Sequence, residues 1–219
     1  GNSADLAAAI TYAADNGATV INMSLGSYGE SLTVKAALEN AYANAFLVAA
    51  AGNETYAIAT NDCDDPIAIQ YPAAYNFVFG VQATGQGPSD NCFDSALAGF
   101  SNYDPNGPAS KSVNYEGKAP GANIYSTFPN GNYKNLNGTS MASPVVAGTI
   151  AMMKEYESQS HEKIFARLVQ STGNTLDAQV VLDYTLIPSL QYTAYNLVDT
   201  LTIGDDDGIP DAGETIEIS

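Results

Sequence analysis

The sequence predicts an α/β fold in which a mostly parallel sheet carries helices on both faces. Helix-like and strand-like segments alternate along the first part of the chain and are joined by short turns. The strand-like segments are apolar throughout, as expected of strands that are covered on both faces in a parallel sheet. The chain has 219 residues, of which 45% are hydrophobic, so it can fill a sizeable core, and its length favours one main domain with a tail.

The first helix-and-strand unit lies at the start of the chain. Residues 3–16 carry apolar side chains at helical spacing, which predicts a helix. Ser3 is the expected N-cap, because its hydroxyl can accept from a free N–H of the first turn, and Gly17 follows the expected helix end. Residues 19–23 form a short apolar run, which predicts a buried strand.

Further helices and strands follow in the same alternation. A second helix is expected over residues 31–44, and an apolar strand over 46–51 leads into a Gly-Asn-Glu turn. Another core strand is expected over 77–81. After a long stretch rich in Gly, Pro, Asn and Ser, helices are expected over 140–156 and 161–171.

The end of the chain differs from the rest in its pattern. Residues 184–219 contain short alternating segments, no helical period and an acidic turn at 204–208. This pattern indicates a linker and the beginning of a β-sandwich domain, separate from a main domain over residues 1–183.

The charge of the chain excludes several classes of protein. Its 24 acidic and 7 basic residues give a formal net charge of -17. Nucleic-acid binding needs clustered Lys and Arg, and a membrane-surface helix needs a basic face, so neither is expected. No apolar run is long enough to predict a membrane span.

Cys63 and Cys92 lie in polar, loop-like sequence. Two cysteines and a single histidine are too few for a tetrahedral metal site that holds only these residue types. The pair favours a disulfide, and with it an oxidising compartment, over two unrelated free thiols.

Ser140 is the candidate nucleophile. It lies in Asn137-Gly-Thr-Ser-Met-Ala-Ser-Pro144, where Gly138 leaves the backbone room before it. In the first turn of a helix the unpaired amides and the positive helix end stabilise negative charge. The alternative is that Ser140 is only a capping residue.

Five segments of the chain resemble the subtilisin-like serine proteases, in the order and near the spacings of that family. They cover residues 1 to about 172 and are Asn22–Gly26, Ala50–Glu54, Tyr71-Pro72, Ala119–Gly121 and Gly138–Pro144. The resemblance implies the three-layer α/β/α fold of the family, incomplete at the N-terminus of this sequence. It also implies a cis peptide bond between Tyr71 and Pro72.

The resemblance implies catalytic roles for two residues. Ser140 matches the nucleophile that attacks the scissile carbonyl, and Asn53 matches the side chain that donates to the oxyanion beside the Ser140 backbone N–H. Without the resemblance, Asn53 would be a turn residue of the kind that tolerates positive φ.

The resemblance also implies a substrate-binding surface. Ser24, Leu25 and Gly26 match the strand edge on which an extended peptide adds as an antiparallel strand, although alone they would be an ordinary strand end. Ala51 and Gly52 match the wall of the pocket for the residue that precedes the cut. Protein or peptide substrates are therefore the expected partners.

The chain departs from the family at the other members of the triad. The family uses Asp, His and Ser in that order, but the sequence holds neither an Asp-Thr-Gly-type nor a His-Gly-Thr-type block. His161 follows Ser140 too far along the expected helix to be its base and is expected to be a solvated surface residue. Asp5 and Asp15 do not match the orienting acid. Val145 stands where the family most often has a non-catalytic histidine, a difference expected to affect packing below the site.

These departures leave half of an active site, for which two explanations compete. The chain is a fragment of a secreted serine endopeptidase whose missing N-terminal segment supplies Asp, His and central strands, or it belongs to a catalytically inactive peptide- or surface-binding protein. We expect the first, with an extracellular or cell-surface location. The 219-residue chain by itself is then expected to be inactive and poorly soluble, because residues 20–24 would form an unpaired apolar edge.

No cofactor is expected to be required for catalysis, but structural Ca²⁺ is an open expectation. The family often holds stabilising Ca²⁺, and two acidic regions carry oxygen donors, although the second is better explained as a solvated acidic turn. The residues are Asp62, Asp64 and Asp65 in the first region and Asp205, Asp207, Asp211 and Glu214 in the second.

Overall fold

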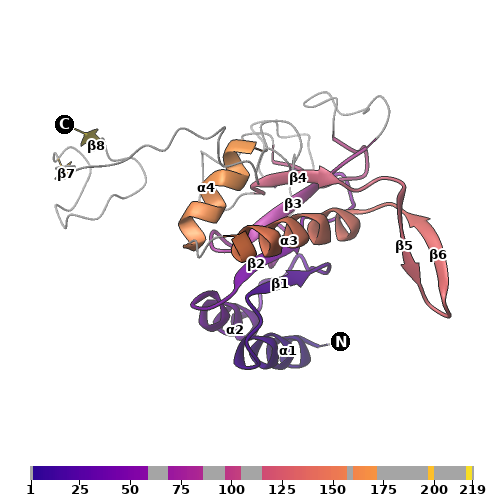
Figure 1. Cartoon of the computed structure of the whole chain (residues 1–219), viewed down its shortest axis with the longest axis horizontal. Helices are drawn as coiled ribbons and strands as arrows, with labels where there is room; N and C mark the ends of the chain where they lie inside the picture. Colours follow the sequence, from indigo (N-terminus) through magenta and orange to yellow (C-terminus); the bar gives the residue numbers. More distant parts are fainter. Residues whose placement is uncertain are drawn as a thin grey trace. The chain divides into compact units, whose positions relative to one another are not determined.

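A parallel sheet of four strands forms the centre of the main unit in the computed structural model (Figure 1). The structure describes residues 2–58, 69–85, 97–104, 115–156, 160–171, 197–199 and 216–218. The strands follow the order β1-β2-β3-β4, and each pairs in parallel with the next. They are β1 (Val20–Met23), β2 (Phe46–Ala50), β3 (Phe79–Thr84) and β4 (Gly117–Pro120). The expected α/β fold with a parallel sheet is thereby confirmed.

Helices cover both faces of this sheet. One face packs against α1 (Ser3–Asp15) and α2 (Leu32–Tyr42), and the other against α3 (Thr139–Tyr156) and α4 (His161–Ser171). Strand β2 is buried along its whole length and alternates between the layers: Leu47 and Ala49 pack toward α1 and α2, whereas Phe46 and Val48 pack toward α3 and α4. This two-sided burial explains the continuous apolar run that indicated a parallel strand.

The helix ends follow ordinary capping chemistry. Asn2 is the N-cap of α1, since its backbone is extended and its side chain accepts from the Asp5 N–H at 2.9 Å. The expectation that Ser3 caps this helix is wrong, because Ser3 is already helical. In α2, the Ser31 hydroxyl accepts from the Val34 N–H at 3.4 Å, as a serine N-cap does.

Two parts of the sheet architecture differ from expectation. Strand β3 begins at Phe79 rather than at residue 77, because the Val78 N–H donates to the Tyr75 carbonyl in a turn. Strand β4 was not expected. It carries a proline and a lysine and sits in a Gly- and Pro-rich context, which local sequence favours as loop.

A hairpin of β5 (Ile124–Phe128) and β6 (Asn132–Leu136) precedes α3 and was also not expected. Its strands are mostly exposed, so they lack the apolar alternation that marks a half-buried strand. The turn between them contains Asn130 and Gly131, both with positive φ, which is the Asn-Gly pattern of tight hairpins.

Strand β1 forms one edge of the sheet. Within the described part of the chain it pairs only with β2, so the expected unpaired edge is present there. Val20 and Ile21 on this strand are half-buried and Asn22 is exposed. None of the described helices is long and apolar enough to cross a membrane.

The chain divides into two compact units, Gly1–Tyr184 and Thr185–Ser219. In the second unit, β7 (Leu197–Asp199) and β8 (Ile216–Ile218) form an antiparallel pair. The assignment of 184–219 as the beginning of a β-sandwich remains a prediction.

Glu116, just before β4, is a buried carboxyl that should make the stability of the fold depend on pH. Burial raises its pKa well above the usual 4.5, although the Gly80 N–H, which donates to Oε2 at 2.6 Å, lowers it in part. The folded state therefore holds this proton more tightly than the unfolded chain does. The resulting stability is present below about pH 4.5 and is lost as the pH rises through the folded pKa.

We expect Glu116→Gln to remove this loss, because a carboxamide oxygen still accepts from Gly80 and carries no charge. As the pH rises from acid to neutral, the Tm of the unsubstituted protein should fall by several degrees relative to that of the variant, since ~1 kcal/mol shifts Tm by about 2–4 °C at this size. The exposed Glu155→Gln serves as control. A Tm difference that stays constant with pH would contradict the prediction.

Candidate active site

The site lies where β1 and β2 end. In open parallel sheets ligands bind beyond the carboxyl ends of the strands. Residues Ser24–Gly26 follow β1, and Ala51–Asn53 follow β2; the strands are neighbours, so these segments lie side by side. The N-terminus of α3 reaches the same place, where the Thr139 hydroxyl accepts from the Gly52 N–H at 3.0 Å.

Asn53 is bound to the beginning of α3. Its Oδ1 accepts from the Thr139 N–H at 2.8 Å and lies 3.1 Å from the Thr139 hydroxyl, which also donates to it. The side chain is exposed, and with Oδ1 occupied in this way, its Nδ2 group is the part that can donate to a ligand. Gly138 has φ +152°, and a Cβ there would lie 3.6 Å from both polar atoms of the Asn53 carboxamide.

Ser140 is the second residue of α3, where backbone N–H groups have no partner within the helix. The residue is half-buried, and its hydroxyl donates to the Ser24 carbonyl at 3.4 Å in an exposed hydrogen bond. In return, the Ser24 hydroxyl donates to the Ser140 carbonyl at 2.9 Å and contacts the Ser143 hydroxyl at 3.0 Å. Ser140 therefore lies beside the edge formed by Ser24–Gly26. It also lies near Asn53, because Asn53 is bound to Thr139, the residue before Ser140.

Two glycines of this site pack against a side chain that sequence reasoning missed. A Cβ at Gly52, which has φ +107°, would lie 2.1 Å from Gln70 Oε1, and a Cβ at Gly26 would lie 2.3 Å from Gln70 Nε2. Gln70 is buried and immediately precedes Tyr71-Pro72. Gly26 and Gly52 are therefore both needed for the close approach of the Gln70 carboxamide. Ala51 and Gly52 are both buried, as the wall of a pocket would be.

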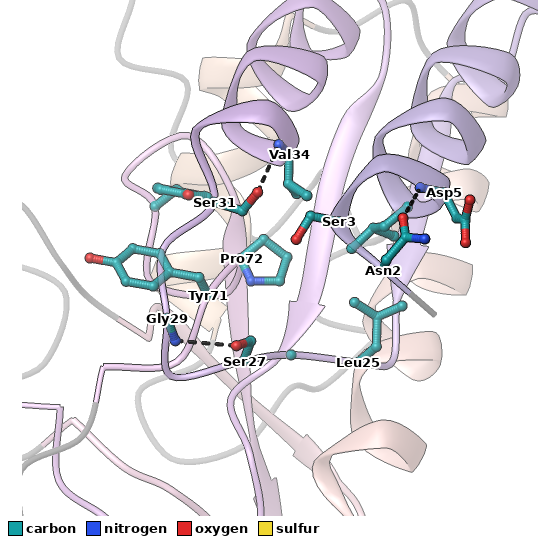
Figure 2. A pocket seen from close by; sticks show the side chains of 13 residues that line it. Asn2, Ser3, Asp5, Leu25, Ser27, Gly29, Ser31, Val34, Tyr71 and Pro72 are labelled. Carbon is teal, nitrogen blue, oxygen red and sulfur yellow. Dashed lines mark hydrogen bonds between the residues drawn. The ribbon is translucent and has the colours of Figure 1, made fainter.

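A pocket of about 750 Å³ opens beside Leu25 and Gly26 (Figure 2). The first turns of α1 and α2 and the segment around Tyr71-Pro72 form its other walls, and apolar side chains such as Leu6 and Val34 line it. The Tyr71-Pro72 bond is cis, as expected. Tyr71 bridges to Ser27 through two backbone hydrogen bonds of 2.9 and 2.8 Å, which hold this wall beside the Leu25 segment.

In the part of the chain that the structure describes, no histidine lies beside Ser140. His161 lies against the rings of Tyr42 and Phe46, with centroids 5.1 and 5.7 Å away, and Phe46 begins β2 at the end opposite Asn53. The expectation that His161 is solvated is wrong. It is half-buried, and burial, with a smaller contribution from Lys154, lowers its pKa.

The structure also places two other residues that the sequence analysis singled out. Asp5 lines the wall of the pocket at the start of α1. Val145 is 37% exposed on α3, and the expected effect on packing below the site remains a prediction.

The remaining candidates lie outside the described residues. These are Cys63, Cys92 and the seven acidic residues proposed for Ca²⁺ in the two regions given above. Among the residues that the structure does describe, no three His, Cys, Asp or Glu side chains are grouped so that they could hold a metal ion. The disulfide and the structural Ca²⁺ both remain predictions.

The site combines a serine at a helix N-terminus, an amide donor beside it and an exposed strand end on an α/β/α scaffold. This combination defines the class of serine peptidases with a subtilisin-like fold. The chain belongs to the subtilase family: the Peptidase S8 family model, described as the subtilase family, matches residues 1–196. The sequence resemblance is thereby confirmed.

Relatives with known names support the same assignment. Subtilisin DY of Bacillus licheniformis is 36% identical over 180 residues, which cover 81% of this chain and 58% of that protein. The major intracellular serine protease of Bacillus subtilis (strain 168) is 37% identical over 171 residues, with 74% and 47% covered. The solved structure titled "S41 Psychrophilic Protease" superposes with a TM-score of 0.63 at 31% identity, covering 81% of this chain and 58% of that one. The chain thus spans about half to three fifths of the length of these proteins.

Proposed function

We propose that this chain is the nucleophile-bearing part of a serine endopeptidase. The observation that carries the proposal is the pair of Asn53–Thr139 hydrogen bonds, which hold a carboxamide donor beside the residue that follows Thr139, namely Ser140. Family membership supports it, since the relatives named above are proteases.

In the proposed reaction the Ser140 Oγ attacks the carbonyl carbon of the scissile peptide bond and passes its proton to a base. The negative oxygen that forms accepts from Asn53 Nδ2 and from the Ser140 N–H. The base then protonates the leaving amine, the C–N bond breaks, and water hydrolyses the acyl-enzyme. No metal or organic cofactor takes part in these steps.

The substrate is proposed to be an extended peptide that pairs with the exposed Ser24–Gly26 segment. Backbone pairing of this kind tolerates many sequences, and neighbouring pockets supply the preference. Ala51 and Gly52 would form the wall beside the residue that precedes the cut. The pocket beside Leu25 would take a second, largely apolar side chain of the peptide.

The base and its orienting acid are proposed to come from a segment outside this sequence. His161 packs near Phe46, whereas Ser140 donates to a backbone carbonyl. Within the described part of the chain, the outer edge of β1 pairs with no strand, so further strands of the sheet can add there. The chain also spans less than two thirds of the relatives named above, which leaves room for such a segment in a longer protein.

Labelling with a fluorophosphonate tests the proposal, because this reagent modifies only a serine that a base has activated. The protein with its upstream coding sequence should be labelled at Ser140, as located by mass spectrometry, and should cleave an unstructured protein such as casein. The 219-residue chain by itself should show neither, because it lacks the base. If the longer protein binds an extended peptide without being labelled, the alternative of a catalytically inactive peptide-binding protein replaces the proposal.

We further propose an extracellular or cell-surface location, supported by the expected pairing of Cys63 with Cys92. One of the relatives is by its name intracellular, so similarity does not decide the location. Modification of both cysteines by a thiol reagent in the unfolded, unreduced protein would contradict it.

A further inference from the structure

Asn102 is a buried polar residue that forms hydrogen bonds to the turn that carries Asn53. Its side chain is 0% exposed. Its Oδ1 accepts from the N–H groups of Glu54 and Tyr56 at 3.1 and 2.9 Å, and its Nδ2 donates to the Ala51 carbonyl at 2.9 Å. The Asn102 backbone N–H also donates to the Gly52 carbonyl at 3.0 Å. These bonds reach the turn both before and after Asn53.

Only a carboxamide of this length provides such a set of bonds. One oxygen accepts from two N–H groups while the nitrogen of the same planar group donates to a carbonyl on the opposite side of the turn. Gly52 is part of the fit, since a Cβ there would lie 2.3 Å from Asn102 Nδ2. Leaving a buried amide without a hydrogen-bond partner is costly, so the Asn102 side chain and the turn hold each other in place.

A second set of contacts ties the same turn to the peptide-binding side. Tyr28, four residues after Ser24, donates its hydroxyl to the Glu54 carboxylate and accepts from Asn102 Nδ2 at 3.1 Å. The Glu54 carboxylate in turn accepts from the Asn53 N–H at 2.8 Å. Burial and the bond to Glu54 raise the pKa of Tyr28 to about 12, so its hydroxyl keeps the proton that it donates at neutral pH.

We propose that Asn102 is a positioning residue for catalysis, which holds the turn of residues 51–56 so that the Asn53 carboxamide faces the site at Ser140. This inference rests on the proposed function. Oxyanion donors act only when they are held at the place where the charge develops, and small displacements of such groups cost large factors in rate. Asn102 touches no reacting atom and acts through Asn53.

A double-mutant cycle with Asn53→Ala in the complete, active protease tests the inference. Asn102→Ala should lower kcat by about 10- to 100-fold with little change in KM, because the donor is needed mainly in the transition state. In the Asn53→Ala background the same change should lower kcat no further, since no donor remains to be positioned. An equal loss in both backgrounds, or an unchanged kcat in the single variant, would overturn the proposal.

The matched control is Gln82→Ala. Gln82 is also a buried carboxamide that bonds backbone groups on both sides, donating to the Tyr115 carbonyl and accepting from the Asp104 N–H, both at 3.1 Å, but it does not bond to the turn. It should lower Tm with kcat preserved. If Asn102→Ala does not fold, Asn102→Ser, which keeps one oxygen able to donate and accept, should give a smaller loss that also vanishes in the Asn53→Ala background.

Hydrogen exchange distinguishes a failure of this inference from a failure of the proposed function. The Glu54 and Tyr56 amides should exchange faster in Asn102→Ala, and not in Gln82→Ala, whether or not the protein hydrolyses peptides. If the unsubstituted protein has no activity but the two amides lose protection in Asn102→Ala, the proposed function fails, whereas the role of Asn102 in holding the turn of residues 51–56 (the Asn102 clamp) is supported. If both amides keep their protection, the clamp itself is refuted.

Discussion

Ser140→Ala in the complete protein is expected to abolish almost all peptide hydrolysis while leaving the fold intact. Among the described residues the Ser140 hydroxyl has one hydrogen bond, a long and exposed one of 3.4 Å to the Ser24 carbonyl, so its removal should change Tm little. In subtilisin itself, the namesake of the family, loss of the nucleophile costs about 10⁶ in kcat. We expect a loss of the same order here, measured with a chromogenic peptide.

A second serine provides the control for this prediction. Ser126→Ala, on an exposed position of β5, should keep full activity because its hydroxyl lies in the hairpin rather than at the helix start. Activity of Ser140→Ala within tenfold of the unsubstituted protein would mean that another group attacks the substrate. Peptide affinity should persist in Ser140→Ala, since Ser24–Gly26 and the pocket are unchanged.

Asn53→Ala is expected to lower kcat by about 10²–10³ with KM nearly unchanged. The magnitude is the one known for the oxyanion donor of subtilisin, which Asn53 matches in sequence, and the loss would follow from removing a hydrogen bond that forms with the developing oxyanion. Two effects are mixed in this variant, because the alanine also loses the bonds from Thr139 to Oδ1 at 2.8 and 3.1 Å.

Asn53→Asp separates the two effects. A carboxylate at this position still accepts from the Thr139 N–H and hydroxyl but has no N–H to donate, and its charge opposes the oxyanion. Its kcat should therefore be at least as low as that of Asn53→Ala, while its Tm should be closer to that of the unsubstituted protein. If Asn53→Asp retains activity, Asn53 supports the helix start and is not the oxyanion donor.

Much of the fold could be predicted from the sequence because its signals are local. The apolar run of β2 and the helical spacing of α1 and α2 depend on which side chains must be buried. Strand β4 was missed because it is short, carries a lysine and a proline, and is held by pairing with β3, which is distant in the sequence. The β5–β6 hairpin was missed because its side chains are mostly exposed and so show no burial pattern. The Asn130-Gly131 turn is a signal that could have revealed the hairpin.

For the same physical reason, some residues of the candidate site could be named from the sequence and others could not. Ser140 and Asn53 lie in compact sequence blocks whose residue types suit their chemistry, so they could be named in advance. Asn102 and Gln70 could not, because their residue types alone do not show which backbone groups they contact, even though Gln70 directly precedes the Tyr71-Pro72 segment. Their importance comes from contacts with Gly52, whose backbone they approach from distant parts of the sequence.

The sequence by itself determined the class of fold and the family, and it named Ser140 and Asn53 as the candidate nucleophile and amide donor, because burial period and short blocks of residues encode these features locally. The tertiary structure alone decided that Asn53 is held against α3 and that Asn102 clamps its turn. It also decided that His161 packs in an aromatic layer away from Ser140. These outcomes depend on which strands pair and in which register, since pairing across the sheet brings residues from distant parts of the chain within hydrogen-bonding distance.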